Sequence, residues 1–448
     1  MVRTFEEIND KIRKGQAVVL TAEEVSRMGE DHSPREIFSQ VDVVTTGTFS
    51  PMCSSGAIVN FGHASPPIRM EKITMNDVEV YSGLAAVDAY IGATSESSKK
   101  KGYGGAHVIE ELITGNDVHL IAEAKGTDCY PRKHIDTYVN KDEINEFYLF
   151  NPRNAYQNYG VAVNGTERVM YTYMGKLLPN FGNAMYATSG ELSPLLNDPE
   201  MRTIGIGTRI FLCGAQGYIV WNGTQFNTEV NTNNHEIPVA PARTIAVIGN
   251  AKEMDPSFLK AAYVKGYGVT LYVGIGIAIP IVDVDMAKRV SIRNENIETV
   301  IFDYGTEGHL PIGKTNYKVL QSGTLEFNGN RIKTGTLTSL QKSKQIAEKL
   351  RDQILRGDFT LTKPVENLPR NSTLNRLKVR EKNSKNKNVI TETCINCGSC
   401  IGVCPTDALF FDENNEVGFN KTLCTDCGLC VDVCPLGLLK MREDDGVH

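Results

Sequence analysis

Two short cysteine runs near the end of the chain carry the clearest chemical signal in the sequence. The first is CINCGSCIGVCP, from Cys394 to Pro405, and the second is CTDCGLCVDVCP, from Cys424 to Pro435. Each has the spacing C-x2-C-x2-C-x3-C-P, which is typical of bacterial ferredoxins with two clusters. A zinc site more often uses two separate C-x2-C pairs. Thiolates are soft ligands suited to iron–sulfur clusters, so we predict two [4Fe-4S] clusters.

The fourth cysteine of each run ligates the other cluster in this arrangement. The first cluster is therefore predicted to take Cys394, Cys397, Cys400 and Cys434. The second is predicted to take Cys424, Cys427, Cys430 and Cys404. The internal repeat predicts a small α+β ferredoxin-like domain, which moves electrons rather than transforming an organic substrate.

Three further cysteines stand alone earlier in the chain, each after an apolar stretch that predicts a strand. Cys53 lies in TTGTFSPMCSSGA, Cys129 in AKGTDCYPRK and Cys213 in RIFLCGAQGY. Functional residues of α/β folds gather at the carboxyl ends of strands, so the three thiols would converge if their strands were parallel neighbours. Small residues around Cys53 and cations such as Lys125 near Cys129 favour reactive thiolates. An inert buried thiol is the simpler interpretation of Cys213, which follows IFL.

A reactive cysteine joined to an electron-carrying domain indicates sulfur transfer. The outer sulfur of a cysteine persulfide is at the oxidation level of S⁰ and needs two electrons to become a thiol. Sulfide that adds to an aldehyde and loses water gives a thioaldehyde, which also needs two electrons. Two clusters that each carry one electron match this number. An alternative stays open, in which Cys53, Cys129 and Cys213 hold a third [4Fe-4S] cluster with one open iron that binds sulfide.

The residues before the ferredoxin-like module predict a mixed α/β body that would position these thiols. TFEE from Thr4, TAEE from Thr21 and SPRE from Ser33 are N-cap signatures that predict three early helices. Apolar stretches such as VDVVTT, VHLIAEA and GVTLYVGIGIAIPIV follow and alternate with Gly-rich turns, as β-strands do. The strand order does not follow from the sequence.

We divide the chain into a catalytic body over residues 1–360, a basic linker over residues 361–388 and a ferredoxin-like domain over residues 389–448. The stretch SLQKSKQIAEKLRDQILRG has apolar residues at helical spacing and ends at Gly357, which predicts the last helix of the body. The stretch PRNSTLNRLKVREKNSKNKN is polar and basic without periodicity, as tethers are.

Composition excludes several other classes of protein. The 448 residues carry a formal net charge of −6, so no basic excess indicates nucleic-acid binding. The beginning, MVRTFEEINDKIRKG, lacks the apolar core of a signal peptide. The longest apolar run, LYVGIGIAIPIVDV, is too short to cross a membrane. GIGTRI and GIGIAI lack the third glycine of a dinucleotide-binding motif. We therefore expect a cytoplasmic protein that acts on a small molecule.

The stretches TGTFSPMCSSGA, KGTDCYPRK, NPRNAYQNY and GTRIFLCGAQGY stand in this order in the body. With them, roughly residues 1–360 resemble the homocysteine biosynthesis family of anaerobes and methanogens, the L-aspartate semialdehyde sulfurtransferases. The resemblance implies conversion of L-aspartate semialdehyde and a sulfide-level sulfur donor to L-homocysteine, with reducing equivalents from a ferredoxin-type partner. That partner is fused here. The resemblance also implies catalytic roles for Cys53, as persulfide carrier, and Cys129, as relay or resolving thiol.

The substrate implied by this resemblance carries a carboxylate, for which a bidentate arginine is the natural partner. Arg153 and Arg209 are candidates, Asn154 lies beside the first, and Lys125 would form a Schiff base or stabilise a thiolate. The candidate proton donors are His63, His107 and Tyr130. We also expect an upstream electron donor and a homodimer. Two alternatives stay open: a persulfide carrier with a ferredoxin release module, and a ferredoxin-fed reductase of unknown substrate.

Overall fold

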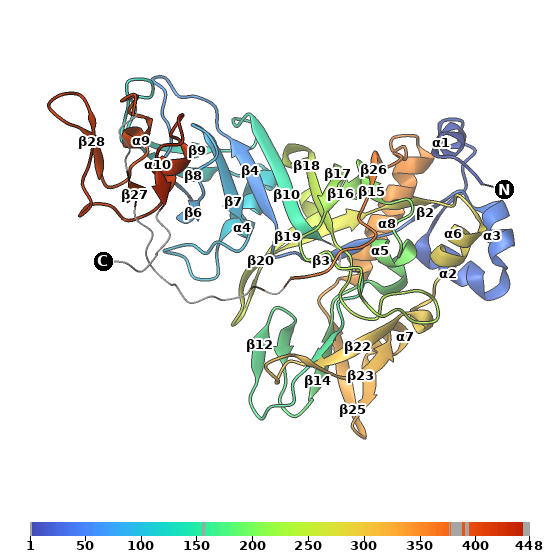
Figure 1. Ribbon diagram of the computed structural model, residues 1–448. Coiled ribbons are helices and arrows are strands. Elements are labelled where there is room, and N and C mark those ends of the chain that lie inside the picture. Colours follow the sequence, from blue (N-terminus) through green and yellow to red (C-terminus); the bar gives the residue numbers. More distant parts are fainter. Residues whose placement is uncertain (1, 155–156, 376, 378–387, 390–393, 442–448) are drawn as a thin grey trace. The chain divides into compact units, whose positions relative to one another are not determined.

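The computed structural model describes residues 2–154, 157–375, 377, 388–389 and 394–441 (Figure 1). The chain forms two compact units, Met1–Leu374 and Asn375–His448. Unit 1 is longer than the predicted body, which ended at residue 360. Leu361 and Leu368 are buried in its core, and β26 (Glu366–Asn367) pairs with β15 (Gly205–Ile206). No helix among the described residues is long and apolar enough to cross a membrane.

Unit 1 begins with the three predicted helices, α1 (Phe5–Arg13), α2 (Ala22–Asp31) and α3 (Pro34–Gln40). Each is closed by a capping box in which the N-cap hydroxyl and a glutamate three residues later bond each other's backbone N–H groups. The early helices are therefore confirmed. α3 packs on α6 (Val284–Val290). β2 (Val43–Thr45) runs between β1 (Val19–Thr21) and β21 (Ala278–Pro280) in a small sheet.

A nine-stranded sheet forms the centre of unit 1, in the order β19-β20-β16-β17-β18-β10-β4-β7, with β3 also paired to β20. Its neighbouring strands pair antiparallel. The strands are β3 (Thr48–Pro51), β4 (Gly56–Asn60), β7 (Asp88–Gly92), β10 (Glu146–Asn154), β16 (Arg209–Leu212), β17 (Ala215–Asn222), β18 (Ile245–Asn250), β19 (Leu259–Val264) and β20 (Gly268–Gly276).

Two helices pack on this sheet, α4 (Gly105–Thr114) and α8 (Leu340–Leu355). α8 lies against β20 and β3, where a Cβ on Gly274 or Gly276 would come within 3.0 Å of the Ile346 side chain. Glycine in β20 therefore allows the helix to approach closely. α8 is the predicted last helix of the body, and the chain turns after it at Gly357, with φ +79°.

A second, six-stranded sheet has the order β23-β22-β11-β14-β25-β24 and its own buried apolar cluster. The pairs β11–β22 and β14–β25 are parallel and the others antiparallel. Its elements are β11 (Val161–Val163), β14 (Asn183–Tyr186), β22 (Glu298–Asp303), β23 (Leu310–Asn316), α7 (Tyr317–Gln321), β24 (Thr324–Phe327) and β25 (Asn330–Thr336). The hairpin of β12 (Met170–Thr172) and β13 (Gly175–Leu177) lies between β11 and β14 in the chain.

A third, antiparallel sheet has the order β6-β5-β8-β9. Its strands are β5 (Lys72–Met75), β6 (Val78–Val80), β8 (Val118–Glu123) and β9 (His134–Val139). The remaining short helices of unit 1 are η1 (Gly190–Leu192), α5 (Pro194–Asn197), η2 (Ala251–Glu253), η3 (Pro256–Phe258) and η4 (Asn294–Asn296). Unit 1 is therefore the mixed α/β fold that the sequence predicted, now with its strand order.

Unit 2 is a small α+β domain built from two similar halves. Its elements are β27 (Asn388–Val389), α9 (Ser399–Gly402), β28 (Leu409–Phe411), β29 (Val417–Phe419), α10 (Leu429–Asp432) and β30 (Lys440–Met441). β27 pairs with β30, and β28 with β29. α9 and α10 each follow a glycine with left-handed backbone, Gly398 (φ 72°) and Gly428 (φ 77°).

Candidate active site

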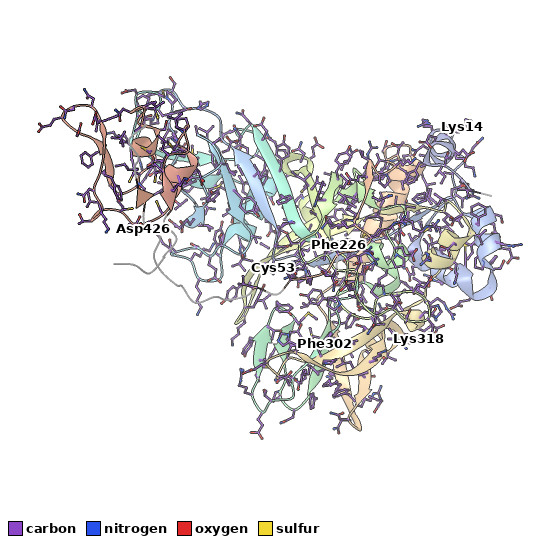
Figure 2. The ribbon with its side chains drawn as sticks, viewed as in Figure 1. Lys14, Cys53, Phe226, Phe302, Lys318 and Asp426 are labelled. Carbon is purple, nitrogen blue, oxygen red and sulfur yellow. The ribbon has the colours of Figure 1, made fainter. Side chains whose placement is uncertain are left out.

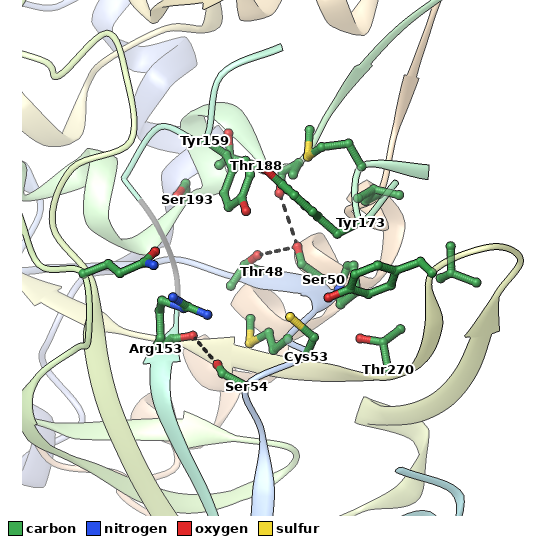
Figure 3. A pocket seen from close by; sticks show the side chains of 18 residues that line it. Thr48, Ser50, Cys53, Ser54, Arg153, Tyr159, Tyr173, Thr188, Ser193 and Thr270 are labelled. Carbon is green, nitrogen blue, oxygen red and sulfur yellow. Dashed lines mark hydrogen bonds between the residues drawn. The ribbon is translucent and has the colours of Figure 1, made fainter. Parts of the chain in front are cut away.

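Cys53 faces a cavity of about 310 Å³ between the nine-stranded and six-stranded sheets of unit 1 (Figures 2 and 3). The walls come from segments far apart in the sequence: the β3–β4 turn, the end of β10, and the tips of the β12–β13 and β19–β20 hairpins. This volume is at the small end of ligand pockets, so the cavity suits a small metabolite. Among its lining residues are Thr48, Ser50, Cys53, Arg153, Tyr159, Tyr173, Thr188, Tyr267 and Thr270.

The turn between β3 and β4 holds Cys53 in place. The backbone N–H of Ser55 donates to the Met52 carbonyl at 3.0 Å, and the Ser55 hydroxyl donates to the same carbonyl at 2.7 Å. Asn151 on β10 donates to the Ser55 hydroxyl at 2.7 Å and accepts from the Ser54 hydroxyl at 3.1 Å. The turn is thus fixed to the neighbouring strand, and the half-buried thiol of Cys53 points into the cavity.

Arg153 supplies the positive charge of the cavity. It is the one charged side chain among the described residues that line the cavity. Its backbone N–H donates to Asn151 at 2.8 Å, which ties it to the strand that fixes the Cys53 turn. A guanidinium in this position would pair with the carboxylate of a small substrate.

Three tyrosines form one wall of the cavity. The ring of Tyr173 lies edge-on to those of Tyr159 and Tyr267, with centroids 6.0 Å and 6.2 Å away. The Tyr173 hydroxyl lies 2.8 Å from the hydroxyl of Tyr304. Burial, followed by a hydrogen bond with Cys53, raises the pKa of Tyr267 above its ordinary value. The Tyr267 phenol therefore stays protonated near neutral pH and is available as a hydrogen-bond donor.

Two hairpin tips meet beside this wall. Gly266, in the turn between β19 and β20, has φ +76°, and a Cβ there would lie 2.4 Å from the Cβ of Tyr171 on β12. Only glycine accommodates both this backbone and this approach. The Lys265 ammonium also lies 5.5 Å from the centre of the Tyr171 ring. The contact keeps Tyr267 on one hairpin beside Tyr173 on the other.

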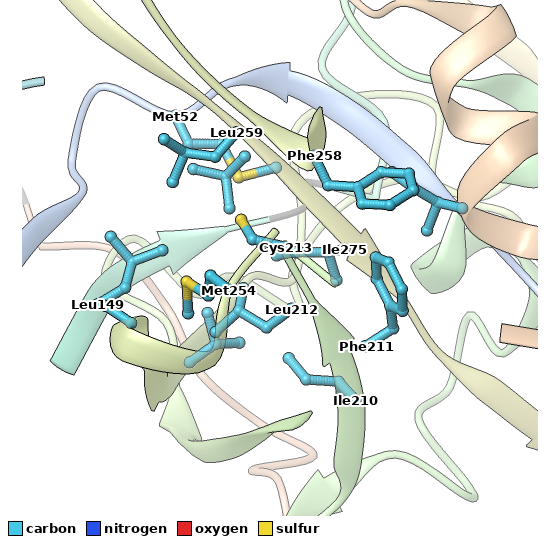
Figure 4. Close-up of a cluster of buried hydrophobic side chains, with 14 of the residues drawn as sticks. Met52, Leu149, Ile210, Phe211, Leu212, Cys213, Met254, Phe258, Leu259 and Ile275 are labelled. Carbon is cyan, nitrogen blue, oxygen red and sulfur yellow. The ribbon is translucent and has the colours of Figure 1, made fainter. Parts of the chain in front are cut away.

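Cys213 lies at the end of β16, in the apolar core of unit 1. Figure 4 shows its thiol among buried side chains that include Met52, Met254 and Leu259. It has no exposed surface and does not line the cavity. Burial raises the pKa of the Cys213 thiol to about 12. The thiol is therefore neutral near neutral pH.

Cys129 lies on the loop between β8 and β9 and is exposed. Arg132 holds this loop by donating to the carbonyls of Ser65 and Pro66 at 2.7 Å and 3.0 Å. The strands before the three lone cysteines pair antiparallel with their neighbours, so the condition on which convergence was predicted is not met. Of the three, Cys53 alone lines the cavity.

The other predicted substrate contacts lie outside the cavity lining. The Arg209 guanidinium donates to the Thr360 hydroxyl at 2.9 Å, within the segment that follows α8. Asn154 is 1% exposed, and its side-chain amide has no hydrogen-bond partner among the described residues. Lys125 is exposed on the β8–β9 loop. Arg153 is therefore the predicted arginine that the fold brings to Cys53.

Unit 2 gathers its cysteines into two groups of four. One cavity is lined by Cys394, Cys397, Cys400 and Cys434, together with apolar side chains. A second cavity is lined by Cys404, Cys424, Cys427 and Cys430. These are the two predicted ligand sets, and each includes one cysteine from the other run. Four thiols around an apolar cavity fit the ligand preference of a [4Fe-4S] cluster.

Sequence reasoning missed the tyrosine wall and Thr270. The three tyrosines come from separate segments. Tyr173 and Tyr267 match no motif, and Tyr159 ends the stretch NPRNAYQNY but was not named as a site residue. A weak signal was the turn KGYGVT, where two glycines bracket Tyr267 between predicted strands.

A cysteine cavity in an α/β body, joined to a domain with two four-cysteine cavities, defines an enzyme fused to a ferredoxin-type electron carrier. Comparison with known families gives the same two parts. Residues 17–361 match the family described as homocysteine biosynthesis enzyme, sulfur-incorporation. Residues 388–441 match the 4Fe-4S dicluster domain. The chain therefore belongs to the sulfur-incorporating homocysteine biosynthesis enzymes.

Two relatives from methanogens carry the same name, L-aspartate semialdehyde sulfurtransferase. The protein of Methanocaldococcus jannaschii is 47% identical over 388 residues, which cover 83% of this chain and 74% of the relative. That of Methanosarcina acetivorans is 47% identical over 380 residues, which cover 84% of this chain and 74% of the relative. An uncharacterized protein of Methanothermobacter thermautotrophicus is 24% identical over 332 residues, which cover 72% of each chain.

Proposed function

We propose that this chain is an L-aspartate semialdehyde sulfurtransferase that forms L-homocysteine. In the overall reaction the aldehyde and the outer sulfur of a persulfide, with four electrons and four protons, give the thiol and one water; from hydrogen sulfide, two electrons and two protons suffice. The observation that carries the proposal is the half-buried thiol of Cys53 in a small cavity whose one charged lining residue, among those described, is Arg153. The name shared by two relatives at 47% identity supports the choice of substrate.

In this proposal Arg153 binds the substrate carboxylate and holds the aldehyde carbon near Cys53. Cys53 carries the incoming sulfur as a persulfide. Two electrons break its S–S bond, which returns Cys53 as a thiolate and releases sulfur at the level of sulfide. This sulfur adds to the aldehyde carbon, the oxygen leaves as water, and two further electrons reduce the C=S bond. A donor that supplies sulfide directly needs only the second pair.

The cysteines of unit 2 are proposed to hold the two [4Fe-4S] clusters, each of which supplies one electron at a time when bound. An upstream donor must reload them after each turnover. The chain also leaves unit 1 next to the cavity. The Ser372 hydroxyl donates to the Phe226 carbonyl at 3.1 Å, and the Ser372 carbonyl accepts from the Thr228 N–H at 2.9 Å. Gln225, next to Phe226 in the chain, lines the cavity.

A third cluster on Cys53, Cys129 and Cys213 is the alternative. It requires Cys213 to leave an apolar core and ionise, and the exposed Cys129 to meet it beside the cavity. We therefore propose that Cys53 acts as a persulfide carrier. The iron content of anaerobically purified protein tests this, because iron for two clusters fits the proposal and iron for three contradicts it.

The test of the function is an anaerobic assay with aspartate semialdehyde, a sulfur donor at the level of S⁰ such as polysulfide, and a low-potential reductant, in which product thiols are identified by mass. Homocysteine is expected only when all three are present. Cys53→Ser should form none while its iron content stays unchanged, and Cys129→Ser shows whether the exposed thiol relays sulfur. Full activity of Cys53→Ser would refute the proposal. A mere sulfur carrier would load persulfide on Cys53 and release no homocysteine without a partner.

A further inference from the structure

Thr270 on β20 presents an unused hydroxyl beside Cys53 (Figure 3). The residue is 1% exposed and lines the cavity, yet its hydroxyl has no hydrogen-bond partner among the described residues. Other hydroxyls of the lining are paired: Thr48 with Ser50 at 3.3 Å, and Thr188 with Tyr317. A buried hydroxyl without a partner is costly, so Thr270 is suited to a ligand atom that enters the cavity.

Tyr267 stands three residues before Thr270 and lines the same cavity as Cys53. Residues three apart in a regular strand point to opposite faces of the sheet. Gly268 between them has φ +127°, outside strand geometry, so the alternation is broken and both residues line the cavity. The two hydroxyls are therefore brought to one side by the start of β20.

The proposed reaction needs a proton at the place where these hydroxyls lie. The aldehyde oxygen leaves as water only after it has gained protons. No aspartate, glutamate, histidine or lysine is among the described residues that line the cavity. Apart from the Cys53 thiol, which carries sulfur in the proposed reaction, tyrosine hydroxyls are the most acidic neutral groups there. The donors suggested by sequence, His63, His107 and Tyr130, are not among the lining residues.

We propose that Tyr267 and Thr270 form an oxygen-binding subsite beside Cys53 that holds the aldehyde oxygen of the substrate and protonates it as it leaves. The inference rests on the proposed function. After sulfide adds, the intermediate is R–CH(OH)–SH. Its C–O bond breaks, the hydroxyl takes the phenol proton of Tyr267 and departs as water. The S–H proton passes to the Tyr267 oxygen as C=S forms. Thr270 donates a hydrogen bond to the same oxygen. This step involves no net oxidation or reduction.

Two conservative variants test the subsite, with a control on the same hairpin. Tyr267→Phe keeps the ring and removes the proton donor, so kcat should fall roughly 100-fold, the scale of general acid catalysis, while KM changes little. Thr270→Val keeps the shape and should lower kcat about tenfold, the scale of one hydrogen bond. Tyr263→Phe alters an exposed tyrosine of β19 that does not line the cavity, and should match the wild type.

Two further measurements separate chemistry from structural damage. Persulfide on Cys53, detected by mass after sulfur loading, should form equally in Tyr267→Phe, Thr270→Val and the wild type, and all should melt at similar temperatures. The double variant should lose less activity than the product of the single losses, because both hydroxyls act on one oxygen. Unrelated structural defects at separate sites would instead multiply.

The subsite is overturned if Tyr267→Phe keeps kcat within about twofold of the wild type. It is also overturned if that variant loses persulfide loading together with turnover, because Tyr267 would then serve Cys53 and not the oxygen. If the loss in the double variant equals the product of the single losses, the claim that both hydroxyls act on one oxygen atom is overturned. No homocysteine from the wild-type protein would refute the proposed function and the subsite with it.

Discussion

Replacement of Cys213 by alanine should leave homocysteine formation intact, because this thiol is buried in an apolar core and does not line the cavity. Burial raises its pKa to about 12. Near pH 8 its thiolate fraction is then about one in 10⁴, since each pH unit below the pKa lowers that fraction tenfold. A neutral thiol is a poor nucleophile for sulfur transfer.

The same burial sets the cost of Cys213→Ala in stability. Loss of one sulfur from a packed core removes about 1 kcal/mol near neutral pH. The folded-state pKa is raised above the ordinary 9.0, so the stabilisation by the neutral thiol is full below pH 9 and falls as pH rises toward 12. At pH 10 the unfolded thiol is mostly ionised, so the wild type should lose roughly 1 kcal/mol relative to its value near pH 8. The alanine variant escapes this loss.

Three measurements on Cys213→Ala check the reasoning: anaerobic turnover, iron per chain, and urea unfolding near pH 8 and pH 10. Turnover within about twofold of the wild type is expected, with unchanged iron and a stability gap that closes at the higher pH. Cys53→Ala is the matched control and should be inactive with the same iron content. A folded Cys213→Ala protein that has lost turnover and a third of its iron would refute the account and establish a third cluster.

Three other outcomes are expected. Gly266→Ala should lower turnover several-fold and lower stability more than Gly323→Ala does. Gly323 has φ +87° and no atom within 4 Å of a new Cβ, so its variant shows the cost of backbone strain alone, about 1 kcal/mol. Melting curves measure both losses, and equal losses would contradict a close contact between the two hairpins. Arg153→Met should raise the KM for aspartate semialdehyde at least tenfold, whereas Arg209→Met should alter stability only; steady-state kinetics decide. A chain ending at Leu374 should form homocysteine far more slowly than the whole chain with the same low-potential reductant, and equal turnover of the two would argue against electron delivery by unit 2.

Local signals in the sequence predicted the parts of the molecule that local physics determines. Thr4, Thr21 and Ser33 each form the capping box that their spacing indicated, because N-cap and glutamate lie within one helical turn. The end of α8 at Gly357 follows from the same kind of short-range rule. The mixed α/β class followed from alternating strand and helix patterns.

The candidate site was predicted only in part, because strand pairing decides it. Cys53 was named from a polar loop that follows an apolar stretch, and Arg153 from the carboxylate of the substrate that the resemblance implies. The prediction that Cys129 and Cys213 join Cys53 needed parallel neighbouring strands. β3 and β16, the strands before Cys53 and Cys213, both pair antiparallel with β20 and so run in the same direction, but Cys213 is turned into the apolar core. Cys129 follows β8, which belongs to another sheet. Tyr173 and Tyr267 meet through a contact between two hairpin tips, and no pattern within either hairpin encodes the partner.

The start of β20 also has a meaning for how this enzyme can vary. The stretch Lys265–Thr270 supplies the glycine turn, the phenol and the hydroxyl, whereas Cys53 and Arg153 lie on other strands. Exchange of this one stretch between related proteins would therefore transfer the handling of the carbonyl group as a unit. Sulfur loading on Cys53 and carboxylate binding by Arg153 would not be changed by this exchange. In the proposed mechanism, changes in this stretch would therefore alter the loss of the carbonyl oxygen without altering the residue that carries sulfur.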